Sequence, residues 1–218
     1  MQEPLPERRP LKTRNAGWAI ALAAWLARRG LAPNAISVLS VVFAAGACAC
    51  FALSASAGTV PRSALLVGAA ACVQLRLICN LLDGMVAIEG GLGTATGALY
   101  NEAPDRLADA LILVGAGWAA RPLPSAVDLG WACAVLAVMT AYIRALGQAL
   151  GGPGSFIGPM AKPQRMATIT VAAVVAAGAA AWGRSAEVLW GALVVVALGT
   201  ALTCVRRLGA IARHLQQR

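Results

Sequence analysis

Residues 63–88 read SALLVGAAACVQLRLICNLLDGMVAI. The run is apolar and long enough to cross the hydrocarbon core of a bilayer, which takes about 20 residues. Its second half nevertheless contains Arg76, Asn80 and Asp83. Ionisable side chains inside a membrane span are costly and usually serve a function. This stretch therefore predicts both a membrane helix and a functional site on that helix.

The whole chain has the composition of a membrane protein. Hydrophobic residues make up 59% of its 218 residues and charged residues only 12%, whereas soluble domains have about 45–50% and about 25%. A soluble core of this size could not bury so much apolar surface, and the chain carries too little charge to be disordered. The net charge of +9 does not indicate a nucleic-acid partner, because the basic residues cluster beside the apolar stretches.

The apolar stretches predict an all-α fold with six transmembrane helices, which together form a domain over residues 33–218. Glycine, proline and serine occupy the breaks between them. The predicted spans are residues 35–57, 63–88, 98–120, 126–149, 165–183 and 186–205. An even number of spans places both termini on the same side of the membrane.

Lysine and arginine near the span ends predict the orientation, since cytoplasmic segments carry an excess of these residues. One face has Arg8, Arg9, Lys12, Arg14, Arg28, Arg29, Arg144, Lys162, Arg165, Arg206, Arg207, Arg213 and Arg218, and the other has Arg62, Arg121 and Arg184. We therefore expect both termini to be cytoplasmic, in a multi-pass protein of the cell inner membrane.

Residues 1–32 form the second predicted unit, a cytoplasmic arm followed by an amphipathic helix. Trp18, Leu22, Trp25 and other apolar residues recur there at helical spacing between basic ends, a pattern typical of a helix lying in the membrane surface. Such a helix is either a lipid-facing shelf beside an active site or a simple interfacial anchor.

The polar residues of the second and third spans follow helical spacing. Asn80 and Asp83 are three apart and share one face, and Asn101, Asp105 and Asp109 are each four apart. A set of carboxylate and amide oxygens that includes no histidine or cysteine suits a hard cation such as Mg²⁺ or Mn²⁺. The alternative is that these acids form buried ion pairs with the arginines at 76 and 106.

The combined string resembles the signature of the CDP-alcohol phosphatidyltransferases. That signature is DxxDGxxAR, eight residues, then GxxxDxxxD, and this chain has Asn80-Leu-Leu-Asp83-Gly84-Met-Val-Ala87-Ile88, eight residues, then Gly97-x-x-x-Asn101-x-x-x-Asp105. Pro33-Asn34 is similar to the family's TPN start. The resemblance covers most of the chain.

The resemblance implies an enzyme of phospholipid biosynthesis. Family members transfer a phosphatidyl group from CDP-diacylglycerol to an alcohol and release CMP, using a divalent metal. By resemblance, Asn80, Asp83, Asn101 and Asp105 are the metal-ligand positions, Gly84, Ala87 and Gly97 line the nucleotide pocket, and Asp105 is the general base. We also expect membrane lipids as neighbours and a homodimer.

Two aspartates of the signature are replaced, by Asn80 and Asn101, and its arginine is replaced by Ile88. The four ligand positions thus carry a formal charge of −2 in place of −4. Three explanations are open: other acids compensate, only one metal binds, or catalysis is lost. The candidate compensating acids are Glu89, Glu102 and Asp109.

A basic set brackets the glycine-rich segment 151–158. Arg144, Lys162 and Arg165 could bind the diphosphate of the donor or a phosphate on the acceptor. They could equally reflect topology and contact with lipid headgroups.

Two other classes of function are open. A degenerate relative would bind a CDP-lipid or a partner without turnover, as Asn80 and Asn101 suggest. A small transporter would need polar residues along the whole path, but the far halves of the spans are nearly free of ionisable groups.

Overall fold

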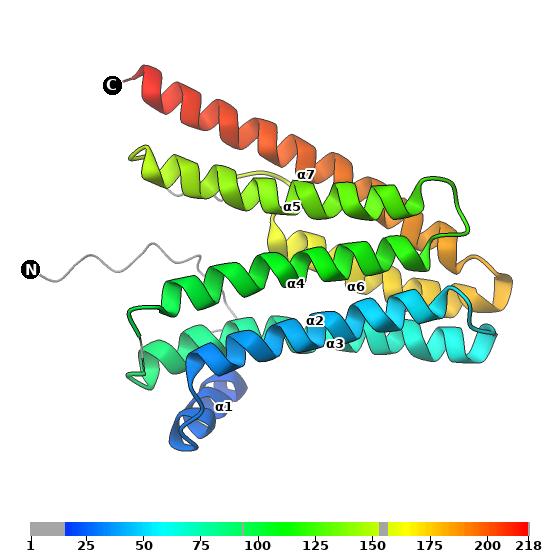
Figure 1. Ribbon diagram of the computed structural model, residues 1–218, viewed down its shortest axis with the longest axis horizontal. Helices are drawn as coiled ribbons and strands as arrows, with labels where there is room; N and C mark the ends of the chain where they lie inside the picture. Colours follow the sequence, from blue (N-terminus) through cyan, green and yellow to red (C-terminus); the bar gives the residue numbers. More distant parts are fainter. Residues whose placement is uncertain (1–15, 93, 153–156, 218) are drawn as a thin grey trace, which may run out of the picture.

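The computed structural model describes residues 16–92, 94–152 and 157–217, without the side chain of Glu89. The predicted all-α class is confirmed, since the described residues form seven α-helices and a short 3₁₀ turn (Figure 1). The helices are α1 (Gly17–Arg28), α2 (Pro33–Ser54), α3 (Thr59–Glu89), α4 (Gly97–Ala119), α5 (Ala126–Ala149), α6 (Lys162–Ala179), the turn η2 (Ala180–Trp182) and α7 (Ser185–Gln216).

Five of these helices, α2, α3, α5, α6 and α7, are long and apolar enough to cross a membrane. Helix α4 has a similar length, but its first half carries Asn101, Glu102, Asp105, Arg106 and Asp109. Each predicted span overlaps one helix of the bundle. Helix α7 extends to Gln216, well beyond the predicted end at residue 205, because the end of an apolar run marks the hydrocarbon boundary and leaves the helix free to continue.

Local sequence explains where the helices begin and end. Pro33 lies in the first turn of α2, where its missing N–H is not needed and its fixed φ suits the helix. Gly91, with φ +63°, ends the α3 region, and Gly183, with φ +68°, separates η2 from α7. These left-handed conformations favour glycine because it has no Cβ.

The bundle packs around small residues. Helix α2 contacts α3 and α4, α5 lies between α4 and α7, and α6 contacts α3 and α7. A Cβ at Gly117 of α4 would lie 2.8 Å from the carbonyl oxygen of Ala126 and 2.9 Å from the Cα of Gly130 on α5. Helices in lipid associate through such close approach.

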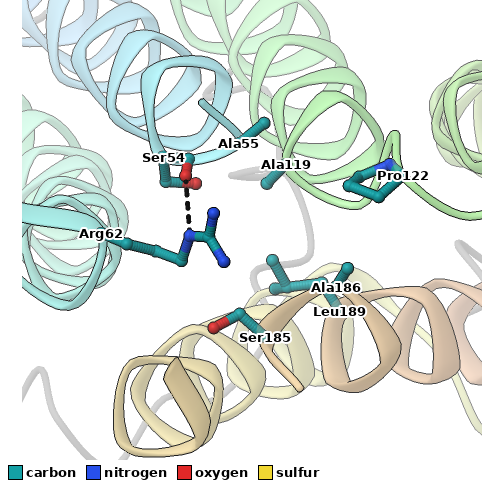
Figure 2. A pocket seen from close by; sticks show the side chains of 8 residues that line it. All are labelled: Ser54, Ala55, Arg62, Ala119, Pro122, Ser185, Ala186 and Leu189. Carbon is teal, nitrogen blue, oxygen red and sulfur yellow. Dashed lines mark hydrogen bonds between the residues drawn. The ribbon is translucent and has the colours of Figure 1, made fainter. Parts of the chain in front are cut away.

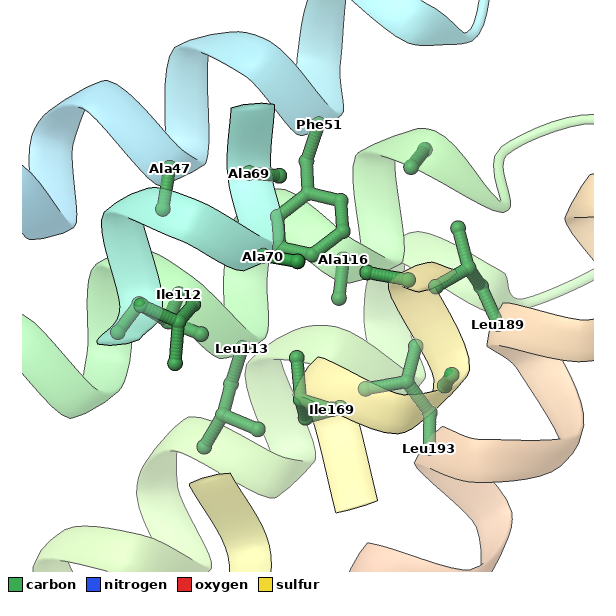
Figure 3. Close-up of a cluster of buried hydrophobic side chains, with 14 of the residues drawn as sticks. Ala47, Phe51, Ala69, Ala70, Ile112, Leu113, Ala116, Ile169, Leu189 and Leu193 are labelled. Carbon is green, nitrogen blue, oxygen red and sulfur yellow. The ribbon is translucent and has the colours of Figure 1, made fainter. Parts of the chain in front are cut away.

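The main core is apolar and alanine-rich (Figure 3). Ala47 and Phe51 of α2, Ala69 of α3, Ala116 of α4 and Leu193 of α7 are fully buried in it. A second, smaller core forms beneath α1, where Ala19 and Ala23 pack with Met85 and Val86 of α3. Trp18 and Trp25 on the other faces of α1 are exposed.

Candidate active site at the polar end of the bundle

The polar residues gather at one end of the bundle. Helix α3 ends and α4 begins there, joined by residues 90–96, and α2 and α6 also begin at this end (Figure 1). We call this region the polar end, and the region around Phe51, Ala116 and Leu189 the apolar end.

The spacing correctly predicted that α3 and α4 turn their polar stripes toward each other. The side-chain amide of Asn80 donates a hydrogen bond to Oδ1 of Asp105. Asp83 follows Asn80 by three residues on α3, so it lies on the same helix face one turn further along. The structure thus brings together three of the four proposed ligand positions, while Asn101 is exposed on the first turns of α4.

Asp105 accepts hydrogen bonds from three side chains on other helices, two of them cationic. The ammonium group of Lys162 on α6 donates to Oδ2. The Nη2 atom of Arg76 lies 3.2 Å from Oδ1 and 3.3 Å from the Asp105 carbonyl oxygen. Asp105 is therefore the carboxylate on which α3, α4 and α6 converge.

Asp83 has a different environment, because both of its carboxylate oxygens accept hydrogen bonds from neutral donors. The hydroxyl of Ser37 on α2 donates to Oδ2 at 2.6 Å, and the backbone N–H of Gly84 donates to Oδ1 at 2.6 Å. Asp83 is also buried. These contacts orient the carboxylate without neutralising its charge.

Asp109 lies one turn deeper, in a buried ion cluster. Its Oδ1 is 2.6 Å from Nη2 of Arg76, and its Oδ2 is 3.1 Å from Nη2 of Arg165. Arg165 also donates to the Met160 carbonyl and to the Thr140 hydroxyl. The alternative that these acids form buried ion pairs is thus correct for Asp109.

The remaining candidates lie at the rim of the polar end. Glu102 pairs with Arg106 and, at 2.7 Å, with Arg144. Arg144 and Lys162 are both partly exposed there, whereas Arg165 is buried behind Asp109. The side chain of Glu89, the third candidate compensating acid, lies outside the described part of the structure.

The glycine positions leave space beside the carboxylates. A Cβ on Gly84 would meet no atom within 4 Å, and one on Gly97 would meet only Thr94 Oγ1, at 3.6 Å. Ala87, one turn beyond Gly84, is partly exposed. This open face suits the proposed approach of a nucleotide.

Three polar contacts were not predicted. Ser37 lies one helical turn after Pro33, which belongs to the Pro33-Asn34 pair that resembles the start of the family's sequence. This position could have marked Ser37 as a candidate site residue. Thr140, which accepts from Arg165, and Arg207, which donates to the Thr140 carbonyl at 2.7 Å, join helices far apart in the sequence, and no local pattern points to them.

Among the described residues, no three histidine, cysteine, aspartate or glutamate side chains converge as they would around a metal ion. The available donors are two carboxylates, Asp83 and Asp105, with amide oxygens at positions 80 and 101. Such a set fits one hard cation better than two.

A small hollow at the opposite end of the bundle has a structural explanation (Figure 2). Arg62 donates from Nε to the Ser54 carbonyl at 3.1 Å and from Nη2 to the Ala57 carbonyl at 3.0 Å. These carbonyls lie at and just after the end of α2, where helix carbonyls lack partners. Arg62 therefore caps α2.

Fold and site together define a helical membrane protein with an acid-containing polar centre at one end. No family model matches the chain. The phosphatidylinositol phosphate synthase of Mycobacterium tuberculosis is 30% identical over 201 residues, covering 87% of this chain and 83% of that protein. The relative from Streptomyces avermitilis is 28% identical over 203 residues, covering 88% and 77% of the two chains.

Solved structures agree with these relatives. The crystal structure of the M. tuberculosis synthase with CDP-DAG bound superposes with a TM-score of 0.73 at 27% identity, covering 90% of this chain and 94% of that one. The same enzyme was solved with manganese and citrate and has a TM-score of 0.72. This chain belongs to the CDP-alcohol phosphatidyltransferase family. It is a membrane-bound transferase of phospholipid biosynthesis.

Proposed function

We propose that this chain transfers the phosphatidyl group of CDP-diacylglycerol, or of a similar CDP-linked donor, to a phosphorylated alcohol and releases CMP. The observation that carries the proposal is the convergence of α3, α4 and α6 on Asp105, beside the buried carboxylate of Asp83. The M. tuberculosis relative, solved with CDP-DAG, supports the choice of donor.

The reaction requires a nucleophile, a leaving group and a place for the proton. The acceptor hydroxyl attacks the phosphorus that carries diacylglycerol, and the bond from that phosphorus to the CMP oxygen breaks. Asp105 takes the hydroxyl proton as general base. Lys162 and Arg76 hold its carboxylate in position, and the open face at Gly84, Ala87 and Gly97 receives the cytidine.

Mg²⁺ or Mn²⁺, held by Asp83 with amide oxygens of Asn80 or Asn101, would offset the charge of the diphosphate and of the departing CMP. The structure of the relative with manganese supports this assignment. The residues of this chain supply the remaining roles: Ser37 and Gly84 orient Asp83, and Asp109 orients Arg76 beneath Asp105.

We assign the phosphate of the acceptor to the rim of the polar end. Lys162 pairs with Asp105, Arg144 pairs with Glu102 on the preceding turn of α4, and both cations are partly exposed. Guanidinium and ammonium groups both bind phosphate. Arg165 contributes from behind, through Asp109.

The proposed topology has six spans. Helix α4 is taken as the sixth, because the acids of its first half form ion pairs with side chains of α3, α5 and α6. Helix α1 lies in the membrane surface as part of a unit over residues 1–32. The transferase domain is residues 33–218. Both termini face the cytoplasm at the inner membrane, and two copies form a homodimer.

The test measures CMP release from labelled CDP-diacylglycerol by purified protein with Mg²⁺ or Mn²⁺. Inositol phosphate, glycerol phosphate and serine serve as acceptors. We expect release with a phosphorylated acceptor, and a loss of about 100- to 10,000-fold in Asp105→Asn. Asp128→Asn, on the first turn of α5 at the other end, is the matched control and should retain activity.

A second candidate function rests on Asn80 and Asn101. A degenerate relative would bind CDP-diacylglycerol without releasing CMP. Donor binding with no CMP release for every acceptor would favour this function over the transferase.

A further inference from the structure

We propose that the ammonium group of Lys162 takes the place of one metal ion, so that this site binds a single divalent cation on the side of Asp83. The inference rests on the proposed function for the identity of the site. It decides among the three explanations that the substitutions at positions 80 and 101 leave open.

The first step is the charge of the ligand positions. Asn80, Asp83, Asn101 and Asp105 carry two negative charges, which balance one dication. Four aspartates at these positions would balance two. An amide oxygen still coordinates a cation, but it contributes no charge.

The second step is that the two candidate compensating acids whose side chains the structure describes, Glu102 and Asp109, do not make up the deficit. Glu102 is engaged by Arg106 and Arg144, and Asp109 by Arg76 and Arg165. Each of these carboxylates already has two arginine partners from the chain itself.

The third step is that both carboxylate oxygens of Asp105 already accept hydrogen bonds from side chains of the protein. Lys162 donates to its Oδ2, and Asn80 and Arg76 donate to its Oδ1. A dication placed against this carboxylate would meet an ammonium and a guanidinium group within a few ångströms, and like charges at that distance repel strongly in a partly buried site. The chain thus supplies its own cation where a second metal would bind.

The fourth step is the contrast with Asp83. Its partners, the Ser37 hydroxyl and the Gly84 N–H, are neutral, and the side chain is buried. Among the described residues, Asp83 therefore has no arginine or lysine in an ion pair with its carboxylate. The single dication belongs there.

The experiment counts Mn²⁺ ions bound per chain by electron paramagnetic resonance of the free ion, in purified protein in nanodiscs. We expect about one Mn²⁺ in the natural protein. Lys162→Met should tighten that binding roughly tenfold, since a neighbouring positive charge is removed. Arg213→Met, which removes an exposed charge on α7, is the matched control and should leave the affinity unchanged.

Two further variants separate the lysine from the asparagines. Asn80→Asp with Asn101→Asp should still bind about one Mn²⁺, and adding Lys162→Met should raise the count to about two. Lys162→Gln replaces Lys162→Met if the latter does not fold, and Lys162→Arg, which keeps the charge, should behave as the natural residue.

The proposal is overturned by any of four results: two Mn²⁺ or none in the natural protein, two in the Asn80→Asp, Asn101→Asp variant, one in the triple variant, or unchanged affinity in Lys162→Met. Its failure is distinct from that of the proposed function. CMP release by protein with two bound Mn²⁺ would contradict the single-cation inference but support the transferase function. One bound Mn²⁺ without CMP release would contradict the transferase function but support the single-cation inference.

Discussion

The polar and apolar ends of this bundle are built by opposite means. At the apolar end, alanines and glycines such as Ala47, Ala116 and Gly117 let helices approach closely. At the polar end, the helices are joined by buried charges, of which Arg76 is fully buried and Asp109 nearly so. Lipid is as apolar as the side chains that it surrounds, so the hydrophobic effect does not drive the helices together, and close packing stabilises the apolar end. Buried charge is costly, and its concentration at one end indicates that function requires it.

The comparison predicts that the polar end is sensitive to loss of charge balance. Asp109→Asn keeps the shape of the side chain but leaves Arg76 and Arg165 short of a counter-charge. We expect a loss of about 3–5 kcal/mol in the free energy of unfolding, measured by reversible denaturation in detergent. CMP release should fall as well, because Arg76 also holds Asp105.

Glu187→Gln is the matched control for Asp109→Asn. Glu187 forms an exposed ion pair with Arg184, at 3.8 Å, at the beginning of α7, and exposed pairs contribute about 0–1 kcal/mol. An equal effect of the two substitutions would mean that burial of charge does not distinguish the two ends.

The apolar end should instead be sensitive to added volume. In Gly117→Ala the new Cβ meets backbone atoms of Ala126 and Gly130, which cannot move aside without separating α4 from α5. Overpacking of this kind costs about 1–3 kcal/mol. Mn²⁺ binding should be unchanged, since the polar end lies away from this contact.

Gly191→Ala gives the opposite expectation and serves as control. A Cβ at Gly191 of α7 meets no atom within 4 Å, so the helix gains up to about 1 kcal/mol from the better propensity of alanine. Thermal denaturation followed by circular dichroism measures both variants. A destabilised Gly191→Ala, or an unaffected Gly117→Ala, would contradict the packing described for the apolar end.

The sequence was sufficient to locate the helices because an apolar run must be about as long as the bilayer is thick. All six predicted spans correspond to helices, and Asn101, Asp105 and Asp109 all lie in α4, where four-residue spacing puts side chains on one face. The helix pairs were not predictable. The pairing depends on which glycine packs against which backbone, as Gly115 of α4 packs against Cys48 of α2. Composition does not predict such pairs.

For the site, too, the contacts between consecutive helices were predictable and the contacts between distant helices were not. The facing of Asn80 and Asp105 follows from spacing on two consecutive helices joined by a short turn. The partners of Asp109 and Glu102 include side chains of α6 and α5, respectively, and no local pattern ties these distant helices to α4. For the same reason the pairing of Asp105 with Lys162 was not predicted, because Lys162 is more than fifty residues away in the sequence.

The smallest effect is expected at the rim, where the charges of the polar end meet solvent. Glu102→Gln removes the pairing with Arg106 and Arg144, but Glu102 is half exposed, so the free energy of unfolding should change by about 0–1 kcal/mol.

Release of Arg144 from Glu102 favours its contact with a phosphorylated acceptor, and KM for that acceptor should fall roughly two- to fivefold. Steady-state CMP release measures this, with serine as the unphosphorylated comparison. The effect should shrink as salt is added, since exposed charges are screened. If KM falls equally for serine, Arg144 does not bind the acceptor phosphate, and the rim contributes to stability and topology alone.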